Sequence, residues 1–103
     1  MIFEPLNDSN QRGEFYGGFC HWHLRRDGQI TIREIIIERG YQGNGQGKIF
    51  LERLKQVSGA TSIFAKCPID LPANDWYKSQ GFELEGIETT QSGRQLKLWR
   101  LTL

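Results

Sequence analysis

Residues 35–48 read IIIERGYQGNGQGK, and this segment joins an apolar, β-branched run to an amphipathic helical pattern. Three glycines alternate with polar residues between Gln42 and Lys48. Glycine adopts positive φ values easily and lets the backbone come close to a ligand. The helix that follows would offer N–H groups without acceptors inside the helix, together with the positive end of its dipole. The segment therefore predicts a turn that binds an anionic group such as phosphate.

The chain after this turn predicts a helix followed by a parallel strand. Apolar residues recur at positions 50, 51, 54 and 57 with charged residues between them, which is the spacing of an amphipathic helix over 47–57. Ser58-Gly59 would end that helix, and 61–67 is expected to form a short buried strand. A strand reached through a helical crossover pairs in parallel with the strand before the helix. The isoleucine strand within 29–38, the glycine turn, this helix and the strand at 61–67 are thus expected to form one βαβ unit.

The chain before the turn predicts a β-hairpin. Aromatic and apolar residues are frequent over 15–24, β-branched residues dominate 29–38, and Arg26-Asp27-Gly28 has turn chemistry. Isoleucines occupy even positions at 30 and 32 but odd positions at 35 and 37, so the alternation slips near Glu34. Such a slip is typical of a β-bulge. Residues 1–13 are polar and weakly patterned, and predict at most a short strand at Ile2 to Phe3.

A second, short helix is expected after the parallel strand. Asp70 is a candidate N-cap, Pro72 suits the first turn, and Gly81 supplies a C-terminal stop. The segments 82–87 and 95–103 then alternate well enough to form a closing hairpin. The whole pattern predicts an α/β (α+β) fold, with a twisted mixed sheet, one crossover helix and one short second helix.

Length and composition narrow the class of protein. The 103 residues suffice for one domain, 1–103, and the 13 basic and 12 acidic residues leave a net charge of only +1 without a basic block. Nucleic acid is therefore not an expected partner. No apolar stretch approaches the length of a membrane span, so no membrane association is expected. The protein is expected to be cytoplasmic. Cys20 and Cys67 lack metal-ligand spacing and are expected to be reduced, buried strand residues.

Spacing separates three interpretations of the glycine turn. A P-loop would need glycine at 42 and Ser or Thr at 49, where this chain has Gln42 and Ile49. A dinucleotide fingerprint needs G-x-G-x-x-G, and Gly43 to Gly47 is one residue short of it. The third pattern is [Gln/Arg]-x-x-Gly-x-[Gly/Ala], which Gln42, Gly45 and Gly47 satisfy.

The third pattern resembles the acetyl-coenzyme A motif of the GNAT superfamily of N-acetyltransferases. A second element of that family, N-x-x-A-x-x-x-Y-x-x-x-G-F, is similar to residues 70–82, with Ala73, Tyr77, Gly81 and Phe82 at the expected offsets. Asp70 stands where the family has asparagine, and nearby Asn74 is a candidate replacement. The resemblance covers about residues 14–103.

The resemblance implies an acetyl-CoA site and a splayed pair of parallel central strands. It implies that the loop amides bind the pyrophosphate, that Lys48 helps neutralise the phosphates, and that the pantetheine arm pairs with the backbone of the isoleucine strand in the splay. The implied acetyl-CoA-binding residues are Ile35, Ile36, Ile37, Gln42, Gly43, Asn44, Gly45, Gln46, Gly47, Lys48, Asp70, Ala73, Asn74 and Tyr77.

The implied reaction is N-acetylation by direct attack of a primary amine on the thioester. Tyr77 is the candidate general acid that protonates the leaving thiolate, as the family uses the tyrosine at this offset. Glu34, at the expected bulge, is the candidate general base, although an exposed carboxylate beside Arg33 is an equally good interpretation. His21 and His23 share one strand face and are alternative bases. No third ligand lies near them in the sequence, so no metal is expected.

The N-terminal region departs from the family, in which a strand and two helices shape the acceptor pocket. Only about 13 residues precede the first clear strand here, so the domain is expected to be an N-terminally shortened member. The amine acceptor is unidentified, and a homodimer could supply the missing wall. The alternative is a non-catalytic acyl-CoA-binding sensor or interaction module.

Overall fold

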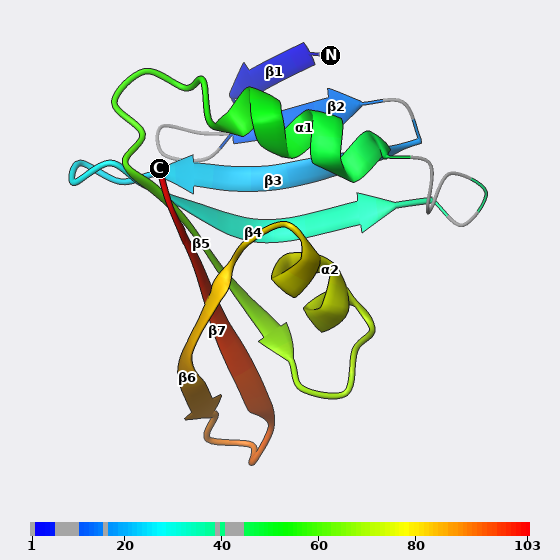
Figure 1. Ribbon diagram of the computed structural model, residues 1–103, viewed down its shortest axis with the longest axis vertical. Coiled ribbons are helices and arrows are strands. Elements are labelled where there is room, and N and C mark those ends of the chain that lie inside the picture. The colour runs from blue at the N-terminus through cyan, green and yellow to red at the C-terminus, as the bar shows by residue number, and fades with distance from the viewer. Residues whose placement is uncertain (1, 6–10, 16, 39, 41–44) are drawn as a thin grey trace.

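The computed structural model describes residues 2–5, 11–15, 17–38, 40 and 45–103. These described residues form one seven-stranded sheet in the order β1-β2-β3-β4-β5-β7-β6, together with two helices (Figure 1). The elements in chain order are β1 Ile2–Pro5, β2 Gln11–Phe15, β3 Gly18–Leu24, β4 Gln29–Ile37, α1 Gln46–Leu54, β5 Ser62–Pro68, α2 Ala73–Ser79, β6 Glu83–Thr89 and β7 Gln95–Thr102.

The first two strands are more extensive than the sequence predicts. β1 pairs antiparallel with β2, and β2 pairs antiparallel with β3 along five residue pairs. The sequence predicted at most one short strand, at Ile2 to Phe3, and this underestimated the strand content of the N-terminal region. Main-chain hydrogen bonds hold β1 and β2 in the sheet, so these strands do not need an alternating apolar pattern that the sequence would reveal. The consequence for the site is that β3 has a neighbour on each side.

The predicted β3–β4 hairpin and its bulge are confirmed. Gly28 turns the chain with a φ of 92°, and its N–H donates to the carbonyl of Arg25 at 3.0 Å. Along the hairpin, His21 pairs with Glu34 whereas the next residue, Trp22, pairs with Ile32. Arg33 is therefore the extra residue of the bulge, and it shifts the alternation so that Ile32 and Ile35 face the same side.

The predicted βαβ unit is also confirmed. Helix α1 buries Phe50, Leu51 and Leu54, each worth about 2 kcal/mol when fully removed from water. β4 and β5 pair in parallel from Gln29 and Ser62 to Ile32 and Ala65. Both strands are described throughout, and beyond these pairs they separate, β4 running on to Ile37 and β5 to Pro68 (Figure 1). This separation is the splay that the family resemblance implies.

The start of the second helix differs from the prediction. Helix α2 begins at Ala73 with Pro72 as its N-cap, and no side chain caps it. Asp70 was therefore wrong as the N-cap, because the chain makes a further turn after β5, in which the N–H of Leu71 donates to the carbonyl of Pro68. The helix ends at Ser79 with Gln80 as its C-cap, and Gly81 follows with a φ of 93°, so glycine stands just after the helix as predicted.

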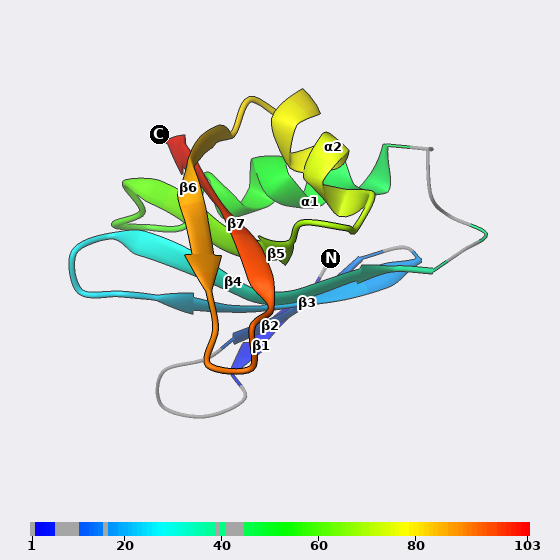
Figure 2. The same ribbon diagram turned by 90° about the horizontal axis from the view of Figure 1, so that it is seen from below.

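The closing hairpin is confirmed, with β7 lying between β5 and β6. Both helices lie on one side of strands β1 to β4 (Figure 2), and the core forms between them and the sheet. Cys20 and Cys67 are free and buried in that core, as predicted. Neither helix in the described part of the chain has the length and hydropathy of a membrane-spanning segment.

Candidate functional site

A cavity of about 590 Å³ opens where β4 and β5 separate. Three elements contribute to it: the end of β4, the first turn of α1, and α2 with the loop before it. The residues that line it are Ile35, Ile37, Gly45, Gln46, Gly47, Lys48, Leu71, Pro72, Ala73, Trp76, Tyr77 and Gln80. The cavity therefore brings together two motifs that are some 25 residues apart in the sequence.

The floor of the cavity at α1 is built from backbone. Gly45 caps the helix with a φ of 84°, a conformation that favours glycine, and its carbonyl accepts the N–H of Ile49 at 3.1 Å. A Cβ on Gly47 would lie 2.9 Å from Ile37 Cδ1 and 3.1 Å from the Trp76 ring. A side chain at position 47 would therefore have to displace Ile37 or Trp76, whereas glycine leaves the first turn of α1 at the edge of the cavity.

The wall on the β4 side comes from alternate residues of the strand. Ile35 and Ile37 line the cavity, whereas Ile36, between them, points to the other face of the sheet and is 41% exposed. The bulge at Arg33 makes this arrangement, because an unbroken alternation from Ile32 would send Ile35 and Ile37 to the open face. Of the predicted isoleucines, two thus contribute side chains and Ile36 offers only its backbone.

The wall on the α2 side contains Tyr77, which is 4% exposed. Its ring packs edge-on against Trp76 and Phe82, with centroids 5.2 Å apart in each case, and stacks with Trp99 at 6.4 Å. Burial raises the pKa of the Tyr77 phenol above its ordinary value, and the neighbouring thiols of Cys67 and Cys20 add to this. The hydroxyl is therefore protonated at neutral pH and can act as a proton donor.

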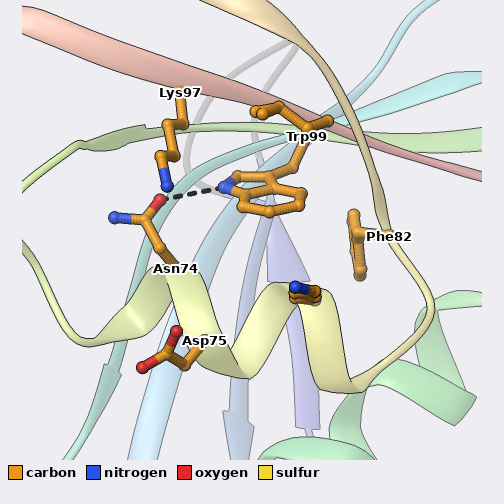
Figure 3. Close-up of a pocket in the computed structure, with 7 residues that line it drawn as sticks. Asn74, Asp75, Phe82, Lys97 and Trp99 are labelled. Carbon is orange, nitrogen blue, oxygen red and sulfur yellow. Dashed lines mark hydrogen bonds between the residues drawn. The ribbon is translucent and has the colours of Figure 1, made fainter.

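Asn74 lies on the other side of α2 from the cavity. Its Nδ2 donates to the carbonyls of Pro68 at 2.8 Å and Leu71 at 2.9 Å, and its Oδ1 accepts the Trp99 indole N–H at 2.9 Å (Figure 3). These bonds anchor α2 to β5 and β7. Asp70 is exposed in the preceding turn and is not among the residues that line the cavity.

A smaller cavity of about 290 Å³ lies on this second side of α2 (Figure 3). Asn74 and Trp99 form part of it, and Lys97 and Asp75 stand at its sides. α2 stands between the two cavities, and none of the described residues of the glycine turn, 45–47, lines this one.

Glu34 lies on the open face of the sheet, two residues beyond the last β4–β5 pair. Its side chain is 50% exposed, and Oε2 lies 3.7 Å from Nδ1 of His21. The carboxylate is close enough to the core to act on Cys20: burial first, and then the charge of Glu34, raises the pKa of that thiol to about 12. His23 pairs instead with Thr31, where β4 is still joined to β5.

Several predicted residues fall outside the described part of the chain, namely Gln42, Gly43 and Asn44. Conversely, four residues line the cavity that are not among the predicted acetyl-CoA-binding residues: Leu71, Pro72, Trp76 and Gln80. Trp76 of α2 and Gln80, the C-cap of that helix, are four residues apart, so the 3.6-residue period around Tyr77 was the signal that could have found them. Among the described residues, no three His, Cys, Asp or Glu side chains form a group that could hold a metal ion.

Comparisons by sequence find no match, either to a family model or to a curated protein. Comparison by structure does find similar proteins. A protein from Bacillus anthracis described as a streptothricin acetyltransferase, in complex with acetyl coenzyme A, matches with a TM-score of 0.79 and 17% identity. The match covers 95% of this chain and 66% of that protein, so this chain spans just under two thirds of its length.

Two further acetyltransferase structures have a similar fold. A protein described as an acetyltransferase of the GNAT family from Desulfovibrio desulfuricans has a TM-score of 0.73 at 15% identity, covering 91% of this chain and 69% of its own. A Bacillus subtilis acetyltransferase in complex with CoA has a TM-score of 0.72 at 18% identity. The match covers 93% of this chain and 78% of that protein. The chain therefore has the fold of the GNAT acetyltransferases.

Proposed function

We propose that this chain is an acetyl-CoA-dependent N-acetyltransferase that transfers the acetyl group to a primary amine by direct attack. One observation carries the proposal: the glycine turn of α1, the separated end of β4 and Tyr77 of α2 all border one cavity. The fold alone would not suffice, because a fold hosts many functions and the site must supply the chemistry.

The cavity suits a long, anionic thioester. The first-turn amides of α1 and the Lys48 ammonium would bind phosphate oxygens, and Gly47 keeps the backbone accessible at that point. The edge of β4 from Ile35 onward no longer pairs with β5, so its peptide groups would pair with the amides of a pantetheine arm. Gln42, Gly43 and Asn44 stay part of the proposed pyrophosphate loop. Asp70 and Asn74 do not line the cavity, and we propose that they act on acetyl-CoA binding only through the position of α2.

Acetyl-CoA would supply an activated acyl carbon and a thiolate leaving group. Tyr77, held in the core beneath the splay, would donate its phenolic proton to the sulfur as the C–S bond breaks. Glu34, on the open face at the same level of the strand, would take a proton from the amine. The two groups would thus act from opposite faces of the sheet.

We further propose that residues 1–103 form one such domain, acting in the cytoplasm. Nucleic acid and membrane are not proposed as partners. A homodimer also stays a proposal, and its expected role is to cover the open face next to Glu34.

The test is release of free thiol from acetyl-CoA in the presence of a panel of primary amines: an alkylamine, a diamine, a polyamine, a lysine-containing peptide and a peptide with a free N-terminus. We expect thiol release with at least one amine. Tyr77→Phe should bind acetyl-CoA as the wild type does but lower kcat about 100-fold, since it removes a general acid and keeps the ring packing.

Two outcomes would count against the proposal. Saturable binding of acetyl-CoA without thiol release from any amine would favour the alternative, a non-catalytic acyl-CoA sensor. An unchanged kcat in Tyr77→Phe would remove Tyr77 from the mechanism.

A further inference from the structure

A row of three side chains crosses the open face of the sheet beside the splay. Arg12 of β2 pairs with His21 of β3, and His21 pairs with Glu34 of β4, so the three residues stand directly opposite one another. Arg12 Nη1 lies 3.0 Å from His21 Nε2, and His21 Nδ1 lies 3.7 Å from Glu34 Oε2. Phe19 supports the row, since the Arg12 guanidinium sits 4.1 Å from the centre of its ring.

The row determines which nitrogen of His21 carries the proton. A guanidinium has N–H donors and no acceptor, so in the Arg12–His21 hydrogen bond Nε2 must be the acceptor. The neutral ring then has its proton on Nδ1, the nitrogen that faces Glu34. The Phe19 ring, 5.2 Å from the imidazole, restricts rotation of His21 out of this arrangement.

The separation of 3.7 Å between Nδ1 and Oε2 is an electrostatic contact, longer than a direct hydrogen bond. The Glu34 side chain is half exposed, so a small rotation of its carboxylate would bring Oε2 to the Nδ1–H donor. That hydrogen bond would occupy one carboxylate oxygen and leave the other facing solvent.

We propose that His21, oriented by Arg12, is a positioning residue that holds the Glu34 carboxylate for deprotonation of the acceptor amine. This rests on the proposed function, in which Glu34 is the base. The neutral amine forms the new C–N bond with its lone pair, the C–S bond breaks, and the thiolate takes the proton of Tyr77. The surplus proton on nitrogen passes to the free oxygen of Glu34, and exchange with solvent later restores both side chains.

The first test reads the tautomer without any ligand. The ring ¹⁵N chemical shifts of His21 and His23 are measured by NMR at about pH 8, above the ordinary histidine pKa. We expect the His21 proton on Nδ1 in the wild type and predominantly on Nε2 in Arg12→Met, with His23 unchanged. A wild-type His21 protonated on Nε2, or a tautomer that Arg12→Met does not alter, would overturn the proposal.

The second test uses the amine that reacts fastest in the thiol-release panel. His21→Leu should lower kcat about tenfold, a part of what a general base contributes, with KM for acetyl-CoA unchanged. His21→Asn should recover most of that loss, because its amide offers an N–H donor near the position of Nδ1–H. Arg25→Leu is the control, because it removes only an exposed ion pair with Asp27 in the turn after β3, and it should keep the wild-type kcat.

Failures of the two proposals are distinguishable. No thiol release by the wild type with any amine would refute the proposed function. Turnover in the wild type with an equal kcat in His21→Leu, or with His21→Asn no better than His21→Leu, would refute only the role of His21.

Discussion

Gly47 is the residue on which access to the cavity depends most directly. We expect Gly47→Ala to weaken acetyl-CoA binding at least tenfold, because its Cβ would fall 2.9 Å from Ile37 Cδ1 and push that side chain and Trp76 into the cavity. Titration calorimetry measures the change. Gly86→Ala is the control, since a Cβ on Gly86 meets no atom within 4 Å; equal affinities in the two variants would contradict this role.

The buried Cys20 thiol makes stability depend on pH in the alkaline range. Burial, followed by the charge of Glu34, raises its pKa from 9.0 to about 12. The unfolded thiol ionises first as pH rises through 9, so this contribution to stability is complete below pH 9 and is lost towards pH 12. At about pH 10 the loss in the free energy of unfolding is about 1.4 kcal/mol.

Denaturant unfolding at about pH 8 and about pH 10 checks this prediction. Cys20→Ala should lose about 1.4 kcal/mol less than the wild type between the two pH values, because it lacks the thiol whose pKa is raised by folding. The same alkaline loss in both proteins would show that Cys20 is not the cause.

For single residues, the sequence predicts a position at the cavity when the residue belongs to a short motif with a defined backbone geometry. Gly45, Gly47 and Tyr77 border the cavity because turn and helix geometry determine their positions. Asn74 was less predictable, since its place on the other side of α2 depends on Trp99, 25 residues later in the chain. The partners of Glu34 were equally hidden, because cross-strand register brings Arg12 and His21 to it.

The buried Asn74 side chain ties helix α2 to the end of β5 and to β7. We expect Asn74→Ala to lower the free energy of unfolding by about 2 kcal/mol, because the Trp99 indole N–H and the Pro68 and Leu71 carbonyls lose their partner. For a domain of this size that corresponds to a Tm lower by roughly 10 °C. Ser79→Ala, which removes an exposed hydrogen bond of the same helix, should change Tm little. Similar melting of both variants would contradict this account.

The elements show where sequence patterns are sufficient and where they are not. The bulge, the α1 crossover and the parallel pair were predictable because hydrophobic period and chain direction determine them. Strands β1 and β2 were mostly missed, since their pairing depends on β3 and not on their own composition. The start of α2 was misplaced because a turn after β5 competes with capping by Asp70.

For the whole molecule, the order of the sheet explains why a cavity exists at all. β5 pairs with β4 over four residues and then continues along β7, so the sheet divides into two parts that diverge. α1 and α2 stand at the two sides of the gap, which remains open between them. The central claim is that this gap receives acetyl-CoA, with its phosphates at the N-terminus of α1.

The most direct test is a calorimetric titration of three proteins with acetyl-CoA: the wild type, Lys48→Glu and Lys78→Glu. Lys48 borders the cavity in the first turn of α1, where a carboxylate also suits the helix dipole, so loss of binding would not reflect unfolding. Lys78 is a residue of α2 that lines the second cavity, on the other side of the helix. We predict saturable binding by the wild type and Lys78→Glu, and affinity at least tenfold lower in Lys48→Glu. No binding by the folded wild type, or equal affinity in all three, would contradict the account.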